Sequence, residues 1–154
     1  MVTERGAGTG LDEKAGAAVS AGGDAISVCH TLGGMRSDSR TRVPIIKNST
    51  GGFSGPAVLP IALRMVWQAS QKVKIPIVGL GGISTRQDAV DMLVSGATAL
   101  PIGTVLFTDP YAHPQSADGL SPHMAHNGLP TLPALPGDVP SPCPPCIAPA
   151  PLLL

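Results

Sequence analysis

The stretch IPIVGLGGISTRQDAVDMLVSGATALPIGT, residues 75–104, decides the fold class of this chain. It opens with Ile75–Gly79, a short apolar run of the kind that forms a fully buried strand. Ser84, followed three residues later by Gln87, predicts a capping box at the start of a helix. A second apolar run follows over 97–102 and predicts another strand. Buried strands joined by an amphipathic helix indicate parallel βα units.

The same alternation is present upstream of this stretch. Asp12–Ala21 is rich in alanine and has acidic residues in its first turn, which predicts a helix. Ala25–Cys29 reads as a short buried strand. Val58–Val73 carries apolar residues at the spacing of one buried helical face, whereas residues 32–50 alternate in charge and are predicted to form a loop. The chain is therefore expected to have an α/β fold built on a parallel sheet.

Composition excludes several classes of function. Ten basic and ten acidic residues give a formal charge of zero, and no cluster of basic residues appears. The sequence therefore shows no basic region of the kind that binds nucleic acid. No apolar run approaches the roughly 18 residues of a membrane span, and the first residues lack the layout of a secretory signal. We expect a cytoplasmic protein without membrane or nucleic-acid partners.

The two ends of the chain lack these periodic patterns. Residues 1–11 include three glycines among mostly small or polar residues. They predict a leader segment without regular secondary structure. Residues 114–154 hold most of the 17 prolines, few charges and no period, which predicts a disordered or polyproline-like tail. The folded part is expected to span residues 12–113.

The tail also contains residues of types that bind metals. Cys143 and Cys146 form a CxxC sequence, and His123 and His126 lie upstream of it. These side chains match the ligand types of a zinc site, and CxxC is also a redox motif. The surrounding prolines offer no scaffold for a zinc site or for a redox-active CxxC helix, so no metal site is predicted. We interpret the tail as low-complexity sequence, with a ligand for an SH3-like or WW-like domain as the alternative.

Paired small residues follow two successive predicted strands. Gly81 and Gly82 come directly after the first strand, and Gly103 and Thr104 follow the next. In βα barrels, the loops after the last two strands commonly bind phosphate through backbone amides. Glycine after a strand is also ordinary turn chemistry, so these residues alone leave both interpretations open.

A longer set of ordered matches points to one family. The run Ile77–Ala97 resembles, position for position, a signature segment of dihydroorotate dehydrogenases. Further segments that look like the same family are Thr31–Met35, Arg42–Ile46, Thr50–Ala57, Pro60–Arg64, Gly103–Thr104 and Phe107–Ala112. The resemblance covers residues 12–113 and is closest to the subclass that passes electrons to NAD through a subunit carrying FAD and an iron–sulphur cluster.

The resemblance implies a fold and a set of site residues. The fold is a partial (βα)8 TIM barrel that contains only the C-terminal strands and helices. The residues implied to contact FMN are Cys29, Gly55, Gly81, Gly82, Gly103 and Thr104. His30 and Thr31 stand where the family has an Asn-Thr pair that binds dihydroorotate or orotate. A neutral imidazole divides donor and acceptor between two ring nitrogens, whereas an amide offers both from one group, so His30 departs from the family pattern.

The resemblance also implies that part of the enzyme is missing. In the family, a cysteine on an earlier barrel loop removes a proton from dihydroorotate, and earlier lysines and asparagines hold the ligands. A barrel of this kind needs eight strands and typically about 250 residues. We therefore predict no catalytic residue here, no activity by the chain alone, and an open sheet edge that Pro101 weakens further.

Two other interpretations of function remain at this point. The chain is either a non-catalytic remnant that retains a flavin or phosphate pocket, or a flavoprotein similar to dihydropyrimidine dehydrogenase, which shares related motifs. A third interpretation is that the leader and tail are translated from sequence not meant to be read in this frame.

Overall fold

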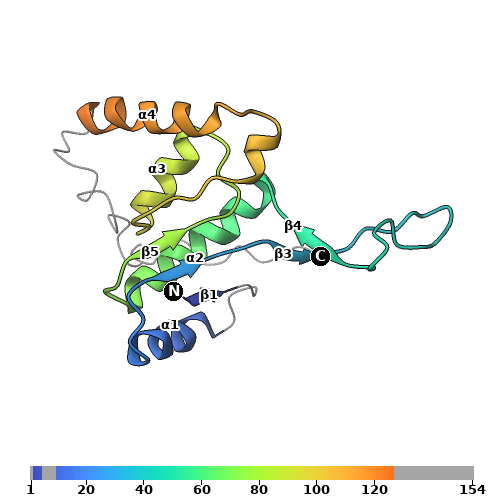
Figure 1. The fold of residues 1–154 in the computed structure, drawn as a ribbon, viewed down its shortest axis with the longest axis horizontal. Helices are drawn as coiled ribbons and strands as arrows, with labels where there is room; N and C mark the ends of the chain where they lie inside the picture. The colour runs from blue at the N-terminus through green and yellow to red at the C-terminus, as the bar shows by residue number, and fades with distance from the viewer. Residues whose placement is uncertain (1, 5–9, 127–154) are drawn as a thin grey trace, which may run out of the picture.

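A computed structural model describes residues 2–4 and 10–126 of the chain (Figure 1). Its elements in chain order are β1 (Val2–Glu4), α1 (Leu11–Ser20), β2 (Ile26–Val28), β3 (Leu32–Gly34), β4 (Gly51–Phe53), the 3-10 helix η1 (Pro56–Val58), α2 (Leu59–Lys72), β5 (Ile77–Gly79), α3 (Arg86–Val94), the 3-10 helix η2 (Thr104–Phe107) and α4 (Ala112–His126). No helix among the described residues combines the length and apolarity needed to cross a bilayer.

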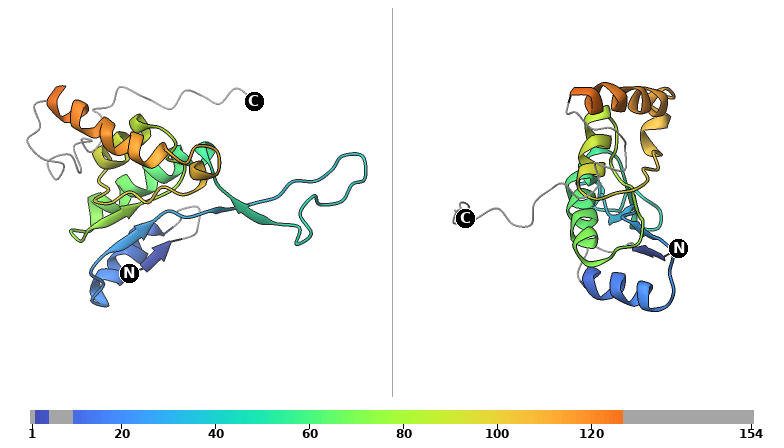
Figure 2. Two further views of the ribbon diagram at one scale, coloured as in Figure 1. Left: turned by 45° about the horizontal axis from the view of Figure 1, so that its top comes forward. Right: turned by 90° about the vertical axis from the view of Figure 1, so that its left-hand side faces the viewer.

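A parallel sheet carries the fold. Its order is β1-β2-β5, with Val2 opposite Ile26 and Ile26 opposite Ile77. A parallel bridge from Val78 to Ala99 adds a fourth strand segment at 98–100. Each of the four segments is followed by a helix, and the four helices form an arc along one side of the sheet (Figure 2). The prediction of a partial βα barrel is confirmed.

The fourth strand segment is shorter than the sequence predicted. Thr98 N–H donates to the Ile77 carbonyl at 2.7 Å, and Gly79 N–H donates to the Ala99 carbonyl at 2.9 Å. The hydrogen bonds to β5 stop there, because Pro101 has no N–H to donate. A strand over the whole of 97–102 was therefore a wrong prediction.

Helix α2 supplies the centre of the core. Ala62, Met65, Val66 and Ala69 are fully buried, as the spacing of apolar residues predicted. They pack with the buried residues of β2 and β5 in one hydrophobic cluster. Burying a side chain the size of valine or methionine contributes roughly 1.5–3 kcal/mol. This face therefore holds the helix layer against the sheet.

The capping box of α3 lies one residue later than predicted. Thr85, not Ser84, is the N-cap: its hydroxyl accepts from Asp88 N–H at 3.2 Å, and the Asp88 carboxylate accepts from Thr85 N–H at 2.8 Å. The carboxylate also accepts from Ser84 N–H at 2.9 Å. Asp88 outcompetes Gln87 because its carboxylate reaches two amides that precede the helix.

Residues 32–53 form a projecting arm where a loop was predicted. Strands β3 and β4 pair antiparallel, with Leu32 opposite Phe53, and the chain between them extends away from the helices (Figures 1 and 2). Near its tip, Asp38 accepts a hydrogen bond from Arg40 N–H at 2.8 Å, which lowers the pKa of that carboxyl group. The two strands were not predicted because glycines, which have no side chain to show an alternating apolar pattern, make up most of both.

Both ends of the chain contain structure that the sequence analysis did not predict. The expected leader, residues 1–11, includes β1, and the expected tail is helical up to His126 in α4. Helix α4 packs on α3, where Gly119 lies so close to Arg86 that a Cβ would overlap that side chain. This tertiary packing compensates for weak helical patterning. The CxxC sequence lies outside the described residues, and those residues contain no cluster of metal-binding side chains.

The corrected cap position is testable by two alanine substitutions. Thr85→Ala removes the hydroxyl that accepts from Asp88 N–H and is expected to lower the free energy of unfolding by about 1 kcal/mol. Ser84→Ala, the control, is expected to change it by less than about 0.5 kcal/mol. Urea unfolding followed by circular dichroism measures both. A larger loss for Ser84→Ala would place the cap where the sequence pattern put it.

Candidate functional site

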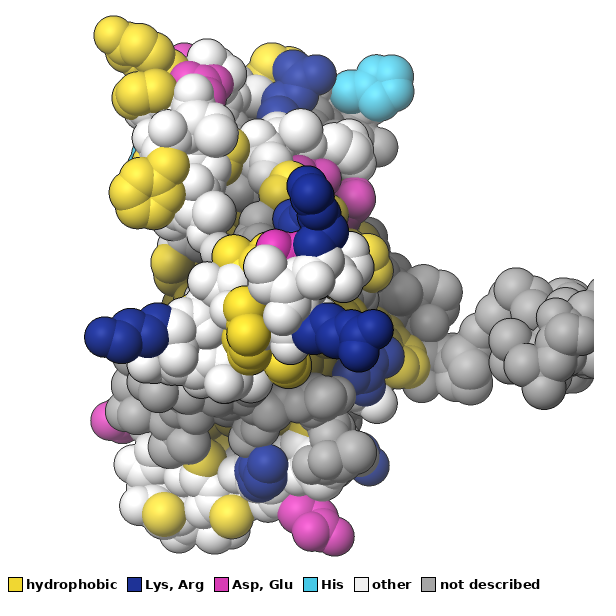
Figure 3. Space-filling view, turned by 90° about the vertical axis from the view of Figure 1, so that its right-hand side faces the viewer, with side chains coloured by type: hydrophobic (Ala, Val, Ile, Leu, Met, Phe, Trp, Pro, Cys, Tyr) yellow, Lys and Arg dark blue, Asp and Glu magenta, His cyan; other side chains and the backbone are white. Residues whose placement is uncertain are grey.

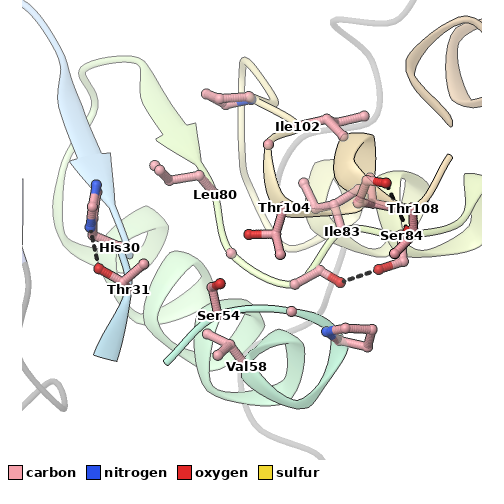
Figure 4. A pocket seen from close by; sticks show the side chains of 17 residues that line it. His30, Thr31, Ser54, Val58, Leu80, Ile83, Ser84, Ile102, Thr104 and Thr108 are labelled. Atoms are coloured by element: carbon pink, nitrogen blue, oxygen red, sulfur yellow. Dashed lines mark hydrogen bonds between the residues drawn. The ribbon is translucent and has the colours of Figure 1, made fainter. Parts of the chain in front are cut away.

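A pocket of about 490 Å³ lies at the carboxyl ends of β2, β5 and strand segment 98–100, beside the start of α2 (Figure 4). Loops at this end of parallel strands are the usual binding position in α/β folds. All predicted site residues except Cys29 line it: His30, Thr31, Gly55, Gly81, Gly82, Gly103 and Thr104. Residues from four separate places in the sequence therefore meet in one cavity.

The turn at Gly81 and Gly82 packs directly on the first turn of α2. Both glycines have positive φ, 120° and 79°. A Cβ on Gly82 would lie 2.5 Å from Leu59 N and 2.8 Å from Leu59 Cα, which is closer than any side chain tolerates. Glycine is required here because the backbone conformation and the close approach both exclude a side chain.

The second turn, Gly103–Thr104, lies in a more open part of the pocket. A Cβ on Gly103 would have no heavy atom within 4 Å. Among the described residues, the backbone N–H groups of Gly81, Gly82, Gly103 and Thr104 donate no hydrogen bond. Unpaired amides at a cavity wall are suited to bind a ligand oxygen, above all an anionic one.

The pocket contains hydroxyl groups but few charges. The described residues contribute no Lys, Arg, Asp or Glu to its lining, and His30 is the one titratable side chain among them. Hydroxyls from Ser54, Ser84 and Thr108 also line it, although the sequence analysis did not select them. The sequence offered a signal for two of them, because Ser54 and Ser84 lie close to the glycine turns, and none for Thr108. Within the described part of the chain, an anion in this pocket would therefore meet amides and hydroxyls and no cationic side chain.

His30 and Thr31 form the end of the pocket next to β2. His30 Nδ1 lies 2.8 Å from Thr31 Oγ1 (Figure 4), so either the ring N–H donates to the hydroxyl or the hydroxyl donates to a bare ring nitrogen. Cys29 differs from both, because it is fully buried and its Sγ donates to the His30 carbonyl at 3.0 Å. Its predicted contact with flavin stays a prediction.

An apolar wall completes the cavity. Val58 and Ile83 are buried, and Leu80 and Ile102 are half-buried, at positions that line the pocket. Aliphatic side chains of this kind cover the face of a planar ring and exclude water from it. The pocket thus combines an apolar surface with unpaired amides at the glycine turns.

Comparison with known proteins identifies the family. The family model for dihydroorotate dehydrogenase matches residues 9–124. The chain belongs to this family. It is 49% identical over 121 residues to the dihydroorotate dehydrogenase B (NAD(+)) catalytic subunit of Geotalea uraniireducens, covering 79% of this chain and 40% of that protein. It is 47% identical over 117 residues to the subunit of the same name from Halalkalibacterium halodurans, covering 76% and 38%.

A solved structure supports the fold. The chain matches dihydroorotate dehydrogenase from Eimeria tenella in complex with ferulenol, with a TM-score of 0.69 and 23% identity. The match covers 83% of this chain and 34% of that one. The chain therefore spans about two fifths of its curated dihydroorotate dehydrogenase relatives and a smaller share of this solved relative.

The close packing of Gly82 is testable against a matched glycine. Gly22 has nearly the same φ, 80°, but a Cβ there would meet nothing within 4 Å. Gly22→Ala is therefore expected to lower the free energy of unfolding by about 1 kcal/mol, from backbone strain alone. Gly82→Ala adds the clash with Leu59 and is expected to lower it by about 3 kcal/mol or more. Equal losses in urea unfolding would contradict the contact.

Proposed function

We propose that the pocket binds FMN, with its phosphate at the turns Gly81–Gly82 and Gly103–Thr104. One observation carries this proposal: glycine turns from two neighbouring parallel strands open into a single cavity with unpaired amides. Phosphate groups are commonly bound by such amides at the C-terminal rim of βα barrels. That the described lining residues include no Lys or Arg is compatible with this, because oriented amides contribute fixed partial positive charge.

The remaining pocket residues also fit a flavin nucleotide. Gly103 has open space where a Cβ would stand, and Gly55, also in the lining, has a φ of 100° that favours glycine. The aliphatic side chains of Val58, Leu80 and Ile102 suit the apolar face of a ring system. When bound, FMN supplies an acceptor for two electrons and a proton. The described residues hold the nucleotide and exclude water from its ring.

We propose dihydroorotate or orotate as the second ligand, at His30 and Thr31. The two side chains lie at the end of β2, on the pocket wall next to Leu80 and Gly81. Thr31 offers a hydroxyl, and His30 offers one ring nitrogen besides the Nδ1 that contacts Thr31. The imidazole of His30 makes fewer hydrogen bonds to a pyrimidine edge than the amide of the family's asparagine does. We therefore propose that this chain binds dihydroorotate or orotate more weakly than the complete family enzymes do.

The chain by itself is proposed to bind without catalysing. Removing a carbon-bound proton requires a positioned base, and losing it costs typically about 10²–10⁴ in rate. Cys29 does not fill that role, because its thiol donates to a backbone carbonyl and does not line the pocket. We propose that the complete activity, the oxidation of dihydroorotate to orotate in pyrimidine synthesis, needs the barrel segments that this chain does not contain.

A protein partner and a location follow from the family. The curated relatives are named catalytic subunits, which implies a further subunit. We propose that this subunit carries FAD and an iron–sulphur cluster and transfers electrons to NAD, and that the assembly is cytoplasmic. No nucleic acid or membrane partner is proposed.

Flavin binding is testable by substitutions in the more open turn, Gly103–Thr104. Thr104 is exposed at the start of η2, where a carboxylate is compatible with the helix, so Thr104→Glu is expected to fold normally. Its charge repels phosphate and is expected to weaken FMN binding at least tenfold, about 1.4 kcal/mol. Quenching of FMN fluorescence measures the affinity. The neutral Thr104→Gln and the distant exposed Thr50→Glu serve as controls and are expected to bind nearly as the parent chain does.

Catalysis is tested separately from binding. Anaerobic addition of dihydroorotate to the FMN-loaded chain is expected to leave the flavin absorbance unchanged, because the base of the family lies on an earlier barrel loop, and His30 stands where the family binds the substrate. Stopped-flow absorbance follows the oxidised flavin band, and a complete relative provides the positive control. Bleaching of the band at near-stoichiometric flavin occupancy would contradict the proposed inactivity and identify this chain as an enzyme. FMN binding without bleaching agrees with a non-catalytic flavin-binding protein.

A further inference from the structure

The two ends of the pocket differ in chemistry. His30 is the one titratable side chain that the described residues contribute to the lining. Together with Thr31 it lies on the other side of Leu80 from Thr104 and Ser84 (Figure 4). A ligand that spans the cavity therefore meets amides and hydroxyls at one end and an imidazole ring at the other.

The hydrogen bonding of His30 leaves one ring nitrogen for a ligand. Nδ1 lies 2.8 Å from Thr31 Oγ1, and no hydrogen bond joins Nε2 to another residue in the described part of the chain. A protonated ring donates from both nitrogens. In that form Nδ1–H donates to the Thr31 hydroxyl, and Nε2–H is left to donate to a ligand. The half-buried ring is thus held at one nitrogen while the other serves the pocket.

We propose that His30 selects ring ligands that carry a carboxylate. The protonated ring donates a hydrogen bond from Nε2 to the carboxylate of the pyrimidine ligand. Such charge-assisted hydrogen bonds are roughly twice as strong as neutral ones. The aliphatic wall beside His30 strengthens the interaction further, because it keeps water away from the two charges. This inference rests on the proposed function, since it concerns the ligand proposed for this end of the pocket.

The selection depends on pH. Histidine gains and loses its proton between about pH 5 and 8. A bound carboxylate favours the protonated ring, so the ligand binds more tightly as the pH falls and loses this added affinity as the pH rises. The ligand carboxylate stays ionised over this range, because carboxyl groups titrate at about pH 4 or below. The same ring without a carboxylate gains nothing from the charge on His30.

The elements packed against β2 offer no other group that titrates in this range. They are β1, β5 and α2. Strand β5 carries no charged residue, and the charged residues of α2, Arg64 and Lys72, are exposed and outside the pocket lining. Strand β1 ends with Glu4, opposite Val28. Basic side chains stay protonated between about pH 5 and 8, and carboxylates stay ionised.

The arm, which begins directly after Thr31, adds charges that are constant over the same range. The hydrogen bond from Arg40 N–H lowers the pKa of the Asp38 carboxyl group, so this group stays ionised. Figure 3 views the molecule from the end of the arm and shows basic side chains uncovered on this face. The exposed basic residues of the arm are Arg36, Arg40, Arg42 and Lys47. A step in ligand affinity in this pH range is therefore assigned to His30.

The first test compares two ligands that differ in the carboxylate. Isothermal titration calorimetry of the full chain measures the affinity for orotate and for uracil. Orotate is expected to bind about tenfold more weakly at about pH 8 than at about pH 5.5, because His30 loses its charge. Uracil, which has the same ring but no carboxylate, is expected to bind no better at the lower pH.

The second test assigns the pH dependence to a residue. His30→Gln keeps neutral hydrogen-bonding groups but takes no charge, and it is expected to bind orotate equally at both pH values. His30→Arg carries a permanent charge and is expected to bind orotate at about pH 8 as the parent chain does at about pH 5.5. The matched controls are His113→Gln, at an exposed histidine on α4 outside the lining, and Glu4→Gln. Both controls are expected to keep the full pH dependence.

A third measurement checks the fold and the position of the FMN phosphate. FMN affinity at about pH 8 is expected to be the same for His30→Gln and the parent chain, because the phosphate is proposed to bind at the glycine turns. Circular dichroism identifies a variant that does not fold. Loss of FMN affinity in a folded His30→Gln chain would place the phosphate at His30, which contradicts both this inference and the proposed orientation of FMN.

Other outcomes separate this inference from the proposed function. Equal orotate affinity at the two pH values, no orotate binding at about pH 5.5, or a pH dependence that persists in His30→Gln overturns the selection by His30. Loss of the dependence in Glu4→Gln or His113→Gln assigns it to another group and also overturns it. FMN binding without orotate binding contradicts this inference but leaves the flavin site standing. Orotate binding that depends on His30 and pH, without FMN binding, supports this inference and contradicts only the proposed flavin site.

Discussion

The approach of the Gly82 backbone to Leu59 is the contact on which the site depends. Because no Cβ intervenes, the turn after β5 lies against the first turn of α2, and the residues before that helix reach the same cavity. The turn at Gly103 follows the next strand segment, which pairs with β5 through Ala99. A single backbone-to-backbone contact therefore sets the distance between the parts of the pocket. A side chain there would separate the helix layer from the sheet rim.

The polar groups of the pocket include the unpaired backbone amides of its glycine turns. Because His30 is the one titratable side chain that the described residues contribute to the lining, the anion binding proposed above would depend on amides and hydroxyls. Such groups are held rigid by the strand ends and cost little reorganisation on binding. The fold and the site are thus coupled, since the two glycine turns lie at one cavity only while the strands keep their parallel alignment.

The described strands of this parallel sheet form an open arc. Its centre is well packed, with the buried face of α2 against β2 and β5, whereas apolar side chains remain uncovered at α1 and after the fourth strand segment. A closed barrel has no such ends. Membership of the dihydroorotate dehydrogenase family and coverage of about two fifths of the relatives' length agree with an arc of four units.

The sequence by itself determined the βα alternation, the buried face of the helix over 58–73 and the two glycine turns, because each is a local pattern of spacing or backbone freedom. It placed the α3 cap one residue early, since Ser84 and Thr85 both carry a hydroxyl, and only the structure shows that the Thr85 hydroxyl accepts from Asp88 N–H. Only the tertiary structure decided that β1, the arm and α4 form, because pairing with β2 and packing on α3 stabilise segments with weak local patterns. It alone brought His30, Gly55, Gly82 and Gly103 into one pocket, since strand order, and not distance along the chain, determines which loops are neighbours.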